Sequence, residues 1–166
     1  MTTGEQTMEK SDKRLVEEQI KIENQFKSGA NWFFWIAGLS IINSASYLTG
    51  SSWHFILGLS VTQFIDGVAR SIHGPYGNMF RMIAFMMDLG FVALFASLGL
   101  WAKQKSSTGF ILGMILYGFD SLMLLLIGSV IGIVFHVLAL VFIFRGLQSL
   151  QKMEEQASAA VATLPS

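Results

Sequence analysis

The sequence predicts an all-α integral membrane protein, and three observations carry that prediction. The chain of 166 residues is 52% hydrophobic and has a mean hydropathy of +0.54. Only 13% of its residues are charged, about half of the roughly 25% that is typical of soluble domains. Most charges lie before Ser28 or after Leu150, so the long middle of the chain is suited to lipid.

Residues 1–29 are predicted to form a polar, helical N-terminal tail. Met8, Leu15, Ile22 and Phe26 fall on one helical stripe, and the charged residues occupy the other faces. Such a helix could lie on a membrane or bind a partner helix. The simpler prediction is a solvated helix that leads into the first membrane span.

The middle of the chain, residues 30–148, is predicted to be a bundle of about five transmembrane helices. A spanning helix needs about 20 mostly apolar residues, and the stretch after Thr108 is nearly twice as long. That stretch must fold back, and Gly128 is the best break because glycine tolerates turn dihedrals. Spans are expected near residues 31–48, 53–72, 80–101, 109–127 and 129–147, followed by a flexible polar tail at 149–166. The alternative is four spans and one re-entrant segment.

Five alternating spans distribute the cations between the two sides of the membrane. One side receives the N-terminal tail, Arg70 and Arg81, and the other receives Lys103, Lys105, Arg145 and Lys152. The tail carries more cations, which favours a cytoplasmic N-terminus in a cell membrane. Four tryptophans near span ends fit an interfacial aromatic belt: Trp32, Trp35, Trp53 and Trp101.

Ionisable and amide residues recur inside the predicted spans. In the second span Gln63, Asp66 and Arg70 share one helical face, and the last two are four residues apart and can pair. The other spans contribute Asn43, Arg81, Asp88, Tyr117, Asp120 and His136.

Depth along each span predicts that these residues meet. Asp66, Asp88, Asp120 and His136 each lie about 9–13 Å from the same predicted surface, counting 1.5 Å per residue. An ionisable group at a helix centre costs roughly 2.5–3.5 kcal/mol, so these groups should face one another, a cavity or water. With His136 protonated and two arginines nearby, one shared cluster would be close to neutral.

Two pairs of glycines spaced four apart allow close helix contacts. Gly109 and Gly113 form the first pair, and Gly128 and Gly132 form the second. Each pair aligns with a polar residue of the predicted cluster. We therefore expect packing inside the bundle rather than a dimer face.

The leading functional prediction is proton, ion or small-solute handling through the polar cluster. The alternative is a non-catalytic accessory or assembly subunit of a membrane complex, in which the cluster only holds helices together. The lipid bilayer is the expected partner, and a homo-oligomer or a larger membrane complex remains open. Nucleic-acid binding is excluded by a net charge of zero and the lack of a basic stripe.

Other chemistries are less well supported. The chain has no cysteine, which excludes disulfides and thiolate catalysis. Aspartates with a histidine suit Mn, Zn or Fe, but the neighbouring arginines oppose a cation, so no metal is predicted. Haem would need two histidines on one side, whereas His54 and His73 are expected near opposite surfaces. Ser129 and His136 resemble a hydrolase pair without an oxyanion hole. No catalytic residue or cofactor is predicted, and an enzyme is disfavoured.

Overall fold

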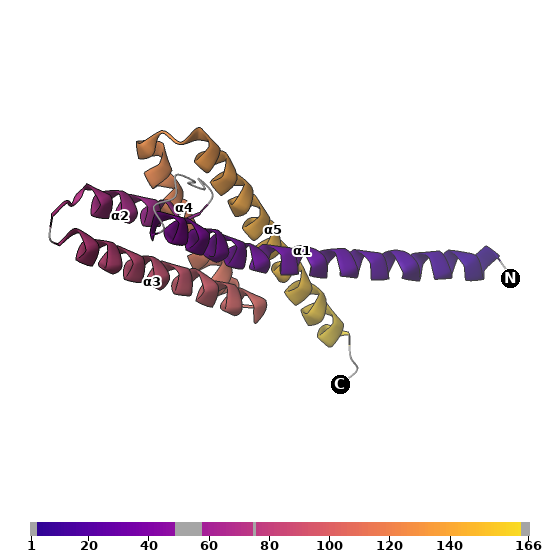
Figure 1. Cartoon of the computed structure of the whole chain (residues 1–166). Helices are drawn as coiled ribbons and strands as arrows, with labels where there is room; N and C mark the ends of the chain where they lie inside the picture. The colour runs from indigo at the N-terminus through magenta and orange to yellow at the C-terminus, as the bar shows by residue number, and fades with distance from the viewer. Residues whose placement is uncertain (1–2, 49–57, 75, 164–166) are drawn as a thin grey trace.

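The protein is a bundle of α-helices. A computed structural model describes residues 3–48, 58–74 and 76–163 (Figure 1). The helices are α1 (Thr3–Leu48), α2 (Ser60–Ser71), α3 (Gly77–Lys103), α4 (Ser107–Ile127) and α5 (Val130–Ala162). No β-strand occurs within these ranges. The predicted all-α class is confirmed.

Three of the helices are long and apolar enough to cross a membrane: α3, α4 over Ser107–Leu125, and α5. The spans predicted near 80–101, 109–127 and 129–147 fall within these helices. Large apolar side chains such as Phe119 and Val130 point outward and are 65% and 72% exposed. Such a surface suits contact with lipid and supports the prediction of a membrane protein.

Helix α1 joins the polar tail to the segment predicted as the first span without a break. Its 46 residues correspond to a length of about 69 Å. The N-terminal part projects from the bundle as a single helix, and the C-terminal part lies among the other helices (Figure 1). The apolar part is interrupted by Asn31, Asn43 and several serines, and α1 is not among the three helices that meet the hydropathy criterion.

Helix α2 runs in the same direction as the C-terminal part of α1. The hydroxyl of Ser40 accepts a hydrogen bond from the Leu59 N–H at 2.9 Å, just before α2 begins. One turn later on α1, Ser44 donates to Asp88 at 2.7 Å, and Asp88 lies against Asp66 in the middle of α2. Positions further along α1 therefore lie beside positions further along α2, so the two helices are parallel.

The direction of α2 departs from the alternation that the predicted five spans require. Alternation requires α2 to run opposite to α1, and α2 has only 12 residues, a length of about 18 Å against a hydrocarbon thickness of about 30 Å. The first part of the predicted second span, with Trp53 and His54, lies outside the described residues.

The remaining helices alternate in direction. Gln25 meets Ser149 and Gly29 meets Gly146, so α1 and α5 are antiparallel. The N-terminal end of α1, the α3–α4 turn and the C-terminal end of α5 consequently lie at one end of the molecule (Figure 1). We call this end the charged end, and the opposite end, with the α2–α3 and α4–α5 turns, the far end.

Local sequence signals explain the helix ends. Gly128 adopts φ 75° after α4, and its N–H donates to the Leu124 carbonyl; this left-handed conformation costs glycine little. The Ser129 hydroxyl then accepts from the Gly132 N–H and caps α5. Ser106 caps α4 in the same way. The break predicted at Gly128 is confirmed.

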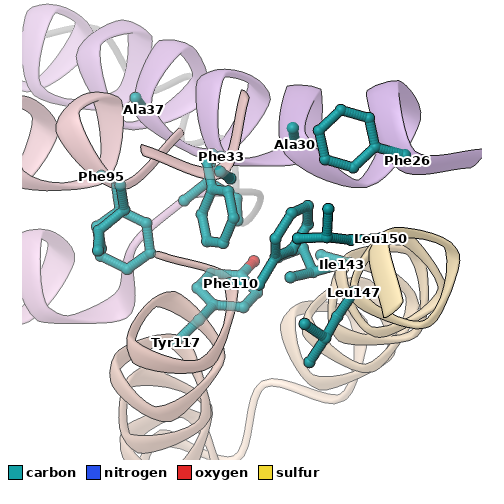
Figure 2. Close-up of a cluster of buried hydrophobic side chains, with 14 of the residues drawn as sticks. Phe26, Ala30, Phe33, Ala37, Phe95, Phe110, Tyr117, Ile143, Leu147 and Leu150 are labelled. Atoms are coloured by element: carbon teal, nitrogen blue, oxygen red, sulfur yellow. The ribbon is translucent and has the colours of Figure 1, made fainter. Parts of the chain in front are cut away.

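The buried core lies where α1 meets α4 and α5. Figure 2 shows Phe33 and Phe110 facing each other, with Phe26 beside them; the ring centroids of Phe33 and Phe110 are 6.1 Å apart. A Cβ on Gly113 would overlap the Phe33 ring, because the ring fills the space that this glycine leaves on α4. Because glycine has no side chain at position 113, the Phe33 ring can pack between α1 and α4.

The closest backbone contact is the crossing of α1 and α5 at Gly29 and Gly146. A Cβ on Gly29 would lie 2.5 Å from the Gly146 Cα, and one on Gly146 would lie 2.7 Å from the Gly29 Cα. Backbone atoms on both sides leave no flexible side chain to move. This contact holds the projecting part of α1 against α5.

We predict that Gly29→Ala destabilises the protein by about 1–3 kcal/mol, the usual range for overpacking. The added methyl group forces α1 and α5 apart at the crossing. The measurement is the melting temperature in detergent micelles. Gly38→Ala is the matched control, because a Cβ at Gly38 meets nothing within 4 Å. Equal melting temperatures for the two variants would show that the crossing carries no packing constraint.

Candidate functional site

The polar residues that the sequence predicts in one cluster form two separate centres. We call Asp120 and His136, with the start of α2, the α2 cap, and Asp66 with Asp88 the carboxyl pair. Ser60, which contacts Asp120, and Asp66 are six residues apart on α2, a distance of about 9 Å along the helix. The predicted residues therefore lie at two levels along α2 rather than one, because α2 begins at the buried Ser60 in the interior of the bundle.

In the α2 cap, the carboxylate of Asp120 receives the first backbone N–H groups of α2. Its Oδ2 accepts from the Ser60 N–H at 2.8 Å, and its Oδ1 accepts from the Val61 N–H at 2.9 Å. The Ser60 hydroxyl donates to the Asp120 main-chain carbonyl. The first N–H groups of a helix have no partner within the helix, and a negative charge there interacts favourably with the helix dipole. A residue of α4 thus caps α2.

The imidazole of His136 completes this centre. His136 is fully buried; its Nε2 lies 2.8 Å from Asp120 Oδ2, and its Nδ1 lies 2.9 Å from the Gly132 carbonyl oxygen. A carbonyl can only accept, so Nδ1 carries a proton. The hydrogen bond between Nε2 and Oδ2 needs one proton, so the pair has no net charge whichever of the two atoms carries that proton.

Tyr117 packs on His136. The two rings are stacked with centroids 4.3 Å apart and an interplanar angle of 9°, so the tyrosine ring covers one face of the imidazole. Phe95 packs edge-on against the Tyr117 ring, with ring centroids 5.9 Å apart. The Tyr117 hydroxyl is buried and has no hydrogen-bond partner among the described residues.

In the carboxyl pair, Asp66 of α2 and Asp88 of α3 lie close enough for one carboxyl group to hydrogen-bond to the other. Such a bond needs a proton on one of the two groups. Ser44 of α1 donates to Asp88 Oδ2 at 2.7 Å, so three helices meet here. The positive charge of Arg70, one turn along α2, acts on the Asp66 carboxyl.

Several buried polar atoms around this pair keep hydrogen-bonding capacity. Oδ1 of Asp66 and of Asp88 has no hydrogen-bond partner within the described chain, and neither do the Asn43 amide atoms or Gln63 Nε2. Buried polar atoms in folded proteins almost always have a partner. These atoms can therefore bind a polar molecule or an ion without losing an existing bond.

The remaining predicted residues lie outside the two centres. Arg81 is exposed on α3, and Arg70 is exposed on α2. Gly132 is buried and supplies the carbonyl that orients His136. A Cβ on Gly128 would meet nothing within 4 Å. Gly128 is therefore needed for the turn and not for a helix contact. Gly109 packs against the end of α3 at Trp101.

No metal-binding group of three or more His, Cys, Asp or Glu side chains occurs in the part of the chain that the structure describes.

Buried serine residues join the helices, and the start of α2 at Ser60 is the feature that the sequence does not indicate. Ser40, Ser44 and Ser60 are all buried, and each bonds a backbone or carboxyl group of another helix. The prediction of one continuous span over residues 53–72 contains no helix start at Ser60. Ser60 is the first residue of α2 and does not cap it, because the cap position is Leu59 and its side chain makes no capping hydrogen bond.

Comparison with known proteins gives no relative. No protein-family model matches the chain, and neither curated proteins nor solved structures give a significant match.

We predict that Asp120→Asn destabilises the protein by about 3–5 kcal/mol, because one partner of a buried ion pair is removed and an amide N–H₂ faces the α2 donors. The free energy of unfolding in micelles measures this loss. Adding His136→Gln to Asp120→Asn should cost less than the sum of the two single changes. Asp12→Asn on the exposed part of α1 is the control and should leave stability unchanged. Additive losses at positions 120 and 136 would contradict the pairing.

Proposed function

We propose that this protein handles protons, a small ion or a small polar solute inside a membrane, with the carboxyl pair as the binding group. The observation that carries the proposal is the contact of Asp66 with Asp88 between helices, with one oxygen of each that has no hydrogen-bond partner among the described residues. Ionisable groups inside membrane bundles are costly and usually functional. The α2 cap, by contrast, has its donors and acceptors matched and serves structure.

The chemistry of the pair suits reversible binding. Two carboxyl groups in contact share one proton, because two adjacent negative charges repel each other. Gaining a proton or a small cation, or losing the shared proton, changes the charge of the pair by one unit. The nearby polar atoms of Asn43 and Gln63 can then stabilise the occupant.

A route to the far end supports the same proposal. Asp66 is five residues from Ser71, where α2 ends, a distance of about 7.5 Å. The exposed Arg70 and His73 lie along this last part of the chain before α3. On the other side, Ser44 and Ser40 line α1 toward the start of α2.

The interrupted backbone at α2 is also in keeping with a transport site. Helices that begin within a membrane protein need their free N–H groups paired by protein, and transporters use such broken helices to form midplane sites. Here Ser40 and Asp120 provide that pairing.

We further propose four crossings, with α1 and α2 together as the first and α3, α4 and α5 as the others. Nine of the 11 Lys and Arg residues then lie at the charged end, and only Arg70 and Arg81 lie at the far end. This asymmetry favours a cell membrane with both termini in the cytoplasm.

An accessory or assembly role is the second candidate, and the projecting part of α1 favours it. Leu15, Val16 and Ile20 are more than half exposed there, which is unusual for apolar side chains on a solvated helix and fits contact with another subunit. In that case the carboxyl pair would only hold α1, α2 and α3 together.

Single cysteines test the topology, and the chain contains none of its own. Four crossings predict that Gln19→Cys, Gln104→Cys and Gln156→Cys share one side of the membrane, while Asn78→Cys and Ser129→Cys share the other. In intact cells an impermeant thiol reagent should label only the second set, and permeabilisation should expose the first. Labelling of Gln19→Cys and Gln104→Cys from opposite sides would restore the five-span order.

Proton flux tests the function. Purified protein in liposomes with an internal pH dye and an imposed potassium diffusion potential should acidify the interior faster than empty liposomes. Asp88→Asn should reduce the rate to that of empty liposomes, because the amide cannot exchange a proton, while the melting temperature changes little. Asp12→Asn is the matched carboxyl-to-amide control and should retain full flux. Destabilisation by Asp88→Asn without flux in the wild type would instead support the accessory role.

A further inference from the structure

A groove beside the crossing of α1 and α5 has the features of a headgroup site. The two helices diverge toward the charged end of the molecule (Figure 1), and a cavity of about 470 Å³ lies between them. Lys21 and Arg145 line it from α1 and α5, with Asn24, Gln25 and Ser28 nearby. We propose that this groove binds the phosphate of an anionic phospholipid. The proposal depends on membrane embedding of α3–α5 and not on proton handling.

The charges in the groove favour an anion. Lys21 and Arg145 come from different helices and face the same cavity, with Glu17 as the only carboxylate in its lining. An arginine guanidinium presents paired N–H donors that match phosphate oxygens, and a lysine adds a second positive charge. The groove therefore has a net positive charge.

Neutral donors complete a phosphate-binding set. The Ser149 hydroxyl lies 2.9 Å from the Arg145 carbonyl oxygen and 3.2 Å from Gln25 Oε1, and the Gln25 amide lines the groove. Asn24 and Ser28 add an amide and a hydroxyl to the same lining. Lys27 differs, because its ammonium hydrogen-bonds to the Glu23 carboxylate at 2.8 Å and holds the pKa of Glu23 below its ordinary value.

The position of the groove matches the level of lipid headgroups. Phe142, at its apolar side, stacks on Trp32 with ring centroids 5.1 Å apart. Trp35 and Trp101, at the same end of the bundle, are 64% and 52% exposed, as expected for tryptophans at a membrane interface. Ser28 lies one helical turn outside Trp32, and Arg145 lies about one turn outside Phe142, where phosphates of the adjacent leaflet are found.

An apolar side distinguishes a lipid from a free phosphate ion. Ile20 and Phe142 line the groove together with the polar residues, so the glycerol and the first acyl carbons have apolar surface to cover. A free phosphate would use only the cations and donors. The lipid is thus the better match to the whole lining.

Native mass spectrometry of the full-length protein in a nonionic detergent tests the proposal. The probes are dioleoylphosphatidylglycerol and dioleoylphosphatidylcholine, which have the same acyl chains. Each basic residue near an anionic headgroup strengthens binding about five-fold, so the wild type should prefer phosphatidylglycerol by about ten-fold or more. Lys21→Gln with Arg145→Gln should bring the two lipids to equal affinity.

The matched control is Lys10→Gln with Lys152→Gln, which removes one cation from each of the same two helices outside the lining of this groove. It should keep the wild-type preference. All four replaced side chains are exposed, so the melting temperatures should stay equal. No preference in the wild type, equal loss in the control, or displacement of the lipid by millimolar inorganic phosphate would each overturn the proposal.

Discussion

The structure depends on how the free N-terminus of α2 is paired inside the bundle. An unsatisfied backbone N–H in a lipid-like interior costs several kcal/mol, so a helix cannot begin there without acceptors. Ser40 of α1 accepts from Leu59, and Asp120 of α4 accepts from Ser60 and Val61. These bonds tie α2 to two other helices and fix where it starts.

The cap then requires His136. A buried carboxylate without a counter-charge would be as unfavourable as the N–H groups that it satisfies. The imidazole of α5 lies at hydrogen-bonding distance, oriented by the Gly132 carbonyl on one side and covered by the Tyr117 ring. The α4–α5 turn at Gly128 brings Asp120 and His136 to the same level, so this left-handed glycine matters to a site about 12 Å away.

Fixing the start of α2 also determines where the carboxyl pair forms. Asp66 is six residues further along α2, and it meets Asp88 where α1, α2 and α3 converge. The two centres differ in kind, since the cap has its hydrogen bonds matched, while one oxygen of each carboxyl of the pair has no partner within the described chain. This difference separates the residues that hold the helices from those proposed to bind a proton, an ion or a solute. At the charged end, the Gly29–Gly146 contact sets the angle at which α1 and α5 diverge around the proposed lipid groove.

Hydropathy and charge distribution alone determined the class of the protein, the three long apolar helices and the break at Gly128, because these depend on local composition and on backbone freedom at one residue. The sequence also placed Asp120 and His136 at a common depth on the two sides of that break, as members of one larger cluster. The direction of α2 did not, since an apolar stretch has the same hydropathy whichever way it runs. Only tertiary contacts decided it, through Ser40 and Ser44, whose hydroxyls select partners by distance and leave no periodic signal in the sequence. The expected cluster is therefore divided into the α2 cap and the carboxyl pair. A helix that starts in the interior needs an acceptor for its first N–H groups, and Asp120 serves α2 in this way instead of lying with Asp66 and Asp88.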